Sequence, residues 1–118
     1  MTQTASGLLI QQVAGIHIVE FIDNNILDQI QVERIRVDLE HLVETAGTPR
    51  LVLNFQRVNL VSSALLGVLM TLDRKTRAKS GAIRLANINN NVRQVFAITR
   101  LERILGIFPS TDAAIENF

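Results

Sequence analysis

The stretch that decides the fold is residues 51–70, LVLNFQRVNLVSSALLGVLM. Residues 51–55 form a nearly continuous apolar run, which is typical of a strand covered on both faces of a sheet. After a loop over 56–61, apolar residues return with helical spacing and predict a helix over 64–79. A buried strand that leads directly into a helix indicates an α/β protein with this strand in the centre of its sheet.

The residues before this stretch predict a hairpin and a long helix. Two β-rich runs, 8–13 and 16–21, are separated by Ala14-Gly15 and are expected to pair antiparallel. A turn at Asn24-Asn25 then leads into a helix over 28–46, where Asp28 and Gln31 have the spacing of a capping box. We expect this helix to end at Gly47 in a left-handed conformation.

The residues after the stretch continue the alternation of strand and helix. Strands are expected at 83–85 and 107–108, with a helix between them that begins at Asn89 or Asn91. Thr111 is the expected cap of a C-terminal helix. The predicted order is β-β-α-β-α-β-α-β-α, a small mixed sheet that opens with an antiparallel hairpin and is covered by about four helices. Residues 1–118 are expected to form a single domain.

Composition argues against several classes of partner. The chain has no cysteine, which excludes disulfides and thiolate metal sites. Its net charge of +1 and its lack of Trp and Tyr give no basis for binding nucleic acid. The sequence has no apolar run of about 18 residues that could cross a bilayer, and no targeting segment at its start. We therefore expect a cytoplasmic protein that contacts neither nucleic acid nor membrane.

The polar residues do not point to catalysis. His41 and Glu44 could share a helix face, but these two positions and His17 do not establish a metal site. Arg93, Arg100 and Arg103 are interpreted as a solvated face. The glycine patterns of nucleotide-binding loops are absent from the sequence. We expect a protein that is not an enzyme and has no cofactor.

Ser62 and Ser63 have two possible roles. Either hydroxyl could cap the helix that follows, because it can accept a hydrogen bond from a free backbone N–H. A single cap needs only one hydroxyl, so the second could be modified. The start of a helix at the carboxyl edge of a sheet favours an anion such as a phosphate. The residues alone leave both roles open.

The segment LVLNFQRVNLVSSALLGVL resembles the signature segment of STAS domains, the family of anti-sigma factor antagonists. The tail GAIRLANINNNVRQVFAITRLERILGIFPSTDAAI is similar to the corresponding part of that family, so the resemblance covers nearly the whole chain. It implies a STAS fold and places the phosphorylatable serine of the family at Ser63, with Ser62 as the second choice. Ser62 stands where the family has an acidic residue, and Leu65 where it has a glycine.

The resemblance implies a function based on partner switching. The unphosphorylated protein would bind an anti-sigma factor of the ATP-dependent serine kinase type, and phosphorylation of Ser63 would end this binding. The implied partner-binding residues are Asn59, Ser62, Ser63, Ala64, Leu65 and Leu66. An exposed Leu65 could equally serve a homodimer. The alternative is a STAS scaffold or accessory subunit of a sensory or transport complex, in which the serines only cap the helix.

Overall fold

The computed structural model describes residues 2–4 and 6–118 as an α/β fold built on one large sheet. The strands are β1 (Thr2–Gln3), β2 (Leu8–Val13), β3 (Ile16–Phe21), β4 (Asn25–Ile26), β5 (Arg50–Asn54), β6 (Leu60–Val61), β7 (Ala82–Ala86) and β8 (Gly106–Phe108). The helices are α1 (Gln29–Thr45), α2 (Ser63–Ala78), α3 (Asn90–Ile98), the 3-10 turn η1 (Leu101–Arg103) and α4 (Thr111–Ile115).

The large sheet has the strand order β1-β2-β3-β5-β7-β8 and is mixed. The hairpin β2-β3 is antiparallel, with Val13 opposite Ile16 across the turn. Strands β3, β5, β7 and β8 are parallel to one another. The predictions of an opening hairpin and of a central strand within 51–55 are therefore confirmed. Strands β1, β4 and β6 were not predicted, and each has only two residues.

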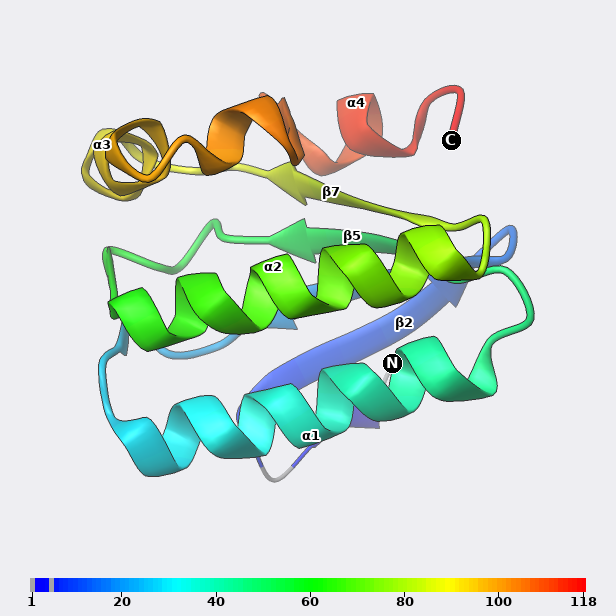
Figure 1. The fold of residues 1–118 in the computed structure, drawn as a ribbon, viewed down its shortest axis with the longest axis horizontal. Coiled ribbons are helices and arrows are strands. Elements are labelled where there is room, and N and C mark those ends of the chain that lie inside the picture. Colours follow the sequence, from blue (N-terminus) through cyan, green and yellow to red (C-terminus); the bar gives the residue numbers. More distant parts are fainter. Residues whose placement is uncertain (1, 5) are drawn as a thin grey trace.

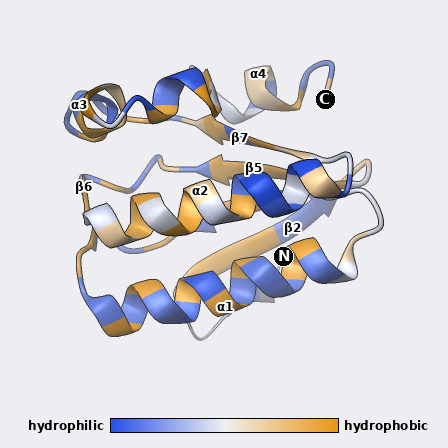
Figure 2. Cartoon of the chain, viewed as in Figure 1, coloured by the Kyte–Doolittle hydropathy of each residue, from blue (hydrophilic) through white to orange (hydrophobic). Residues whose placement is uncertain are grey.

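Helices cover both faces of the sheet. Helices α1 and α2 lie side by side across one face, whereas α4 lies near β5 and β7 (Figure 1). The main core lies under α1 and α2 and includes Phe21, Phe55 and Phe96, all at most 1% exposed. A smaller apolar cluster under α4 contains Val52 and Ala114. Figure 2 shows that hydrophobic and hydrophilic residues alternate along α1 and α2, as expected for helices with one buried face.

Capping residues begin the four α-helices. The side chains of Asp28, Ser62, Asn89 and Ser110 each accept a hydrogen bond from a backbone N–H three residues later. Asp28 was predicted, and Ser62 and Asn89 were among the candidates. The prediction of Thr111 as a cap was wrong, because the Ser110 hydroxyl accepts from Ala113 and Thr111 is already helical.

The C-terminal end of α1 also differs from the prediction. Gly47 was expected to be left-handed, but it has no positive φ, and Ala46 caps α1 in an extended conformation. The Lys79 ammonium group donates to the carbonyl oxygens of Val43 and Glu44, at 2.8 and 3.0 Å. The cation at the C-cap of α2 thus satisfies carbonyl oxygens that would otherwise accept from the backbone N–H groups of a glycine cap.

The parallel strands fix where the helices begin. Helices α1, α2 and α3 all start at the edge of the sheet where β3, β5 and β7 end (Figure 1). This edge of an open α/β sheet is where ligands and partners commonly bind. None of the helices in the described ranges is both long and apolar enough to cross a membrane.

Candidate functional site

The two serines are held in place by a short second sheet. Strand β6 pairs in parallel with β4, so that Asn25 lies opposite Leu60. The Asn24 carbonyl oxygen accepts from the backbone N–H groups of Asn59, at 2.6 Å, and Leu60, at 3.3 Å. The Ile26 carbonyl oxygen accepts from the Ser62 N–H at 2.9 Å. The segment before α1 therefore fixes the segment before α2.

Asn89 fixes the same loop from the side of α3. Its amide nitrogen donates to the Val58 carbonyl oxygen at 3.0 Å and to the Asn59 side chain at 3.2 Å. Its amide oxygen accepts from the Val92 N–H at 2.9 Å and caps α3. One side chain thus joins the start of α3 to the serine loop. The sequence indicated the capping role of Asn89, but nothing in it indicated the contact with Val58 and Asn59.

Ser62 and Ser63 have different environments. The Ser62 hydroxyl accepts from the Leu65 N–H at 3.3 Å, and the residue is half-buried. Ser63 is the first residue of α2 and is exposed. Within residues 2–4 and 6–118, the Ser63 hydroxyl makes no hydrogen bond. Ser62 therefore caps the helix. The Ser63 hydroxyl lies at the positive end of the helix dipole and does not take part in capping.

The expectation of an exposed Leu65 is wrong. Leu65 is 0% exposed and Leu66 is 3% exposed, because a helix that begins at residue 63 turns both side chains toward the sheet. Neither side chain can contact a partner or a second copy in this conformation. The exposed face of this helix end is formed by Ser63, Ala64 and Gly67.

This exposed face of Ser63, Ala64 and Gly67, which we call the serine face, carries only small side chains. A methyl group added to Gly67 would meet nothing within 4 Å, so the space above it is open. Small residues allow the backbone of another molecule to come close to the helix. One turn further along α2, Met70 is 44% exposed and supplies apolar surface. Asn59, an expected partner-binding residue, is exposed beside this face in the loop before β6.

Two apolar residues beside the serine face were missed by the sequence analysis. Leu60 is 47% exposed and Leu27 is 51% exposed. Leu27 follows Ile26, which pairs with Val61, so it lies next to the start of α2. The signal that could have revealed Leu27 is the pairing of β4 with β6, and strands of two residues leave no periodic pattern.

The other polar candidates do not come together. No group of three or more His, Asp or Glu side chains that could hold a metal ion occurs within residues 2–4 and 6–118. His17 lies in β3, whereas His41 and Glu44 are exposed on α1. Arg93, Arg100 and Arg103 are all exposed, in agreement with their interpretation as a solvated face.

Comparison with known proteins identifies the family. The family model described as STAS domain matches residues 8–114. The chain belongs to the STAS domain family. This confirms the resemblance that was based on the serine segment and its flanks, and the match contains every element of the serine face.

Several solved structures share this fold. An anti-sigma-factor antagonist (STAS) domain protein from Planctomyces limnophilus is 13% identical, with 91% of this chain and 92% of that chain covered and a TM-score of 0.81. The anti-sigma factor antagonist SpoIIAA in its unphosphorylated form is 21% identical over 89% and 90% of the two chains, with a TM-score of 0.68. The murine anion transporter Slc26a9 is 20% identical over 89% of this chain but only 18% of its own, with a TM-score of 0.74.

The separate tasks of the two serines can be tested by alanine substitution. Ser62→Ala should lower the free energy of unfolding by about 1 kcal/mol, because the Leu65 N–H loses the hydroxyl acceptor and keeps only the Ser62 carbonyl oxygen, at 3.2 Å. Ser63→Ala should leave it within about 0.5 kcal/mol, because the hydroxyl caps nothing. Urea denaturation of both variants checks this. Equal losses in the two variants would show that Ser63 shares the capping role.

Proposed function

We propose that this STAS domain is a cytoplasmic, non-catalytic anti-sigma factor antagonist that is switched off by phosphorylation of Ser63. The observation that supports the proposal is that the two serines have different roles in the fold. Ser62 caps α2, whereas Ser63 is exposed in the first turn of the helix. A kinase can therefore modify the Ser63 hydroxyl without removing a bond that stabilises the fold.

The chemistry of a phosphate at this position supports a switch of binding rather than of folding. A phosphoserine carries a charge of about −1.5 to −2 at neutral pH. The start of α2 favours a negative charge, so the phosphorylated domain would stay folded. The same charge would lie beside Leu60 and Leu27, and a partner that covers these apolar residues would have to remove it from water.

The shape of the serine face supports a partner that approaches the helix closely. Ser63, Ala64 and Gly67 form a surface without large side chains, and Asn59 offers an amide at its border. We propose that an anti-sigma factor of the ATP-dependent serine kinase type covers this surface, because such a partner must bring its catalytic site to the Ser63 hydroxyl. SpoIIAA of Bacillus, which shares the fold, has been solved in a phosphorylated and an unphosphorylated form.

Affinity capture from a desalted lysate of the native host, with ADP and magnesium so that no phosphate is transferred to Ser63 during the capture, tests the proposal. The wild type and Ser63→Ala should retain a serine-kinase-type ATPase, and Ser63→Asp should retain at least about tenfold less, since a carboxylate imitates part of the phosphate charge. Ser62→Asn is the matched control, because asparagine is also a good N-cap. Equal retention of that ATPase by Ser63→Asp and the control would contradict a switch at Ser63.

A second function is favoured by one observation. Ser62, which caps the helix, stands where the family has an acidic residue, so the site lacks a charge that a kinase could read. The domain would then be a scaffold or accessory subunit, and transporters such as Slc26a9 contain the same fold. This function predicts a stable complex whose affinity is the same for the wild type, Ser63→Ala and Ser63→Asp.

A further inference from the structure

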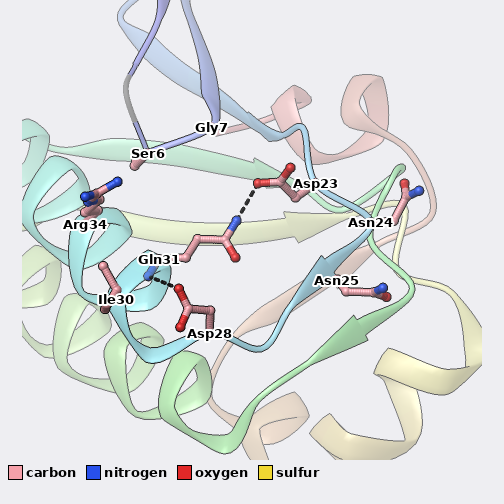
Figure 3. Close-up of a pocket in the computed structure, with 9 residues that line it drawn as sticks. All are labelled: Ser6, Gly7, Asp23, Asn24, Asn25, Asp28, Ile30, Gln31 and Arg34. Atoms are coloured by element: carbon pink, nitrogen blue, oxygen red, sulfur yellow. Dashed lines mark hydrogen bonds between the residues drawn. The ribbon is translucent and has the colours of Figure 1, made fainter.

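We propose that the outer side of α1 carries a second protein-docking groove, which binds a basic, amphipathic segment of a partner. The groove has a volume of about 560 Å³ and lies between the loop before β4, the start of α1 and the N-terminal segment at Ser6-Gly7 (Figure 3). None of its lining residues belongs to α2. The proposal therefore does not depend on Ser63.

The groove has an excess of acidic groups. Asp23 and Asp28 line it, and Arg34 is its one basic residue among the described lining residues (Figure 3). A smaller hollow of about 300 Å³ extends it past Arg34 and adds Glu33 and Asp38. Glu33 is paired with Arg36, but within residues 2–4 and 6–118 no ion pair involves Asp23, Asp28 or Asp38. Asp23, Asp28 and Asp38 are opposed only by Arg34 among the described lining residues, so the two hollows together keep two negative charges in excess.

The groove also has an apolar border. Ile30 is 64% exposed and Val37 is 51% exposed. The two residues are seven positions apart on α1 and therefore lie on the same side of the helix, two turns from each other. Ile30 and Val37 line two adjoining hollows, and apolar residues gathered along one groove mark contact surfaces more often than residues scattered singly. The combination of apolar and acidic lining residues distinguishes this surface from an ordinary solvated helix face.

The groove is preformed. The Gln31 amide donates to the Asp23 carboxylate, and the Asp28 carboxylate accepts from the Gln31 N–H at 3.3 Å (Figure 3). Gly7 has a φ of +85°, and a methyl group added there would lie 2.9 Å from an Asp23 oxygen. The glycine thus allows the N-terminal segment to close against Asp23. A partner would find both carboxylates already oriented, which lowers the entropic cost of binding.

Charge complementarity identifies the occupant. A lysine or arginine side chain reaches into such a groove with its cationic end and covers Ile30 with its aliphatic part. Apolar residues on the same side of the partner segment would contact Ile30 and Val37, as in other complexes of a helix with a groove. The repulsion between carboxylates disfavours an acidic segment. The partner chemistry is therefore basic and apolar at helical spacing.

Selection from a displayed library of random peptides, each of about 15 residues or four helical turns, tests the proposal. The groove variant carries Asp23→Asn, Asp28→Asn and Ile30→Ser. Asparagine keeps the acceptor for Gln31 at position 23 and the helix cap at position 28, so the fold is retained. The control variant, with Glu102→Gln, Glu116→Gln and Ile98→Ser, loses the same charge and the same apolar group at exposed positions elsewhere.

Peptides enriched on the wild type should carry Lys or Arg together with apolar residues at helical spacing. They should bind the wild type and the control variant equally, and the groove variant about tenfold more weakly. Their binding to the wild type should weaken as salt is raised. Absence of enrichment, enrichment of peptides without basic residues, or equal binding to the groove variant would overturn the proposal. A concentration-dependent dimer that the groove variant abolishes would also overturn it, by assigning the surface to self-association.

Discussion

Phe55→Ala is expected to lower the free energy of unfolding by about 3–5 kcal/mol. Phe55 is 0% exposed, and its ring lies between those of Phe21, at 4.8 Å between centroids, and Phe96, at 6.1 Å. Phe21 comes from β3, Phe55 directly follows β5, and Phe96 comes from α3, so the substitution leaves a cavity where three segments meet. A domain of this size is stable by only about 5–15 kcal/mol, and much of that would be lost.

Chemical denaturation monitored by far-UV circular dichroism measures this loss. Ile98→Ala is the matched control, because Ile98 is 82% exposed on α3 and its truncation should change the stability by less than about 0.5 kcal/mol. The description of the core would be contradicted if Phe55→Ala cost no more than the control.

Gly81→Ala is expected to cost about 3 kcal/mol, which is large for the addition of one methyl group. Gly81 lies between α2 and β7, where a methyl group would stand 1.9 Å from the Pro49 carbonyl oxygen. The backbone of one of the two segments must move. This movement would break the hydrogen bond from the Ala82 N–H to the same oxygen, at 3.0 Å, which begins the pairing of β5 with β7.

Gly67→Ala is a control that should change the stability in the opposite direction. Gly67 lies inside α2, where an added methyl group meets nothing within 4 Å. Alanine in a helix interior is more favourable than glycine by about 0.5–1 kcal/mol, so this variant should be more stable than the wild type. If both glycine variants shift the urea midpoint in the same direction, the close approach of Gly81 to Pro49 is refuted.

The parts of the fold that the sequence predicted are those with local causes. The hairpin, the central strand and helices α1 and α2 each have a local apolar pattern, and a polar residue precedes each of the two helices. Each element was found within one or two residues of its predicted bounds. Strands β4 and β6 were missed for the opposite reason. They have two residues each and exist because Asn24 bonds the backbone of Asn59 and Leu60, which lie far away in the sequence. No local pattern records such a contact.

The sequence analysis predicted where the two serines lie in the fold, but it did not predict which residues around them are exposed. The residues alone placed the two serines at the start of α2, and the structure shows that Ser62 caps this helix and that Ser63 is its first residue. The expectation of an exposed Leu65 came from its alignment with a glycine of the family. Helical phase contradicts it, because Leu65, Leu69 and Leu72 are spaced to lie on one side and are all 0% exposed. The helical periodicity of these residues, applied to the first turn of α2, predicts that Leu65 is buried.

The measurement that tests the central claim most directly is phosphopeptide mapping combined with partner binding. The wild-type protein is incubated with ATP, magnesium and the captured kinase-type partner, and the modified residue is identified by fragmentation mass spectrometry. The purified phosphorylated and unmodified forms are then compared for affinity to the partner. We predict phosphate on Ser63 and not on Ser62, with affinity at least about tenfold lower in the phosphorylated form. Phosphate on another residue, or equal affinity of the two forms, would contradict the account.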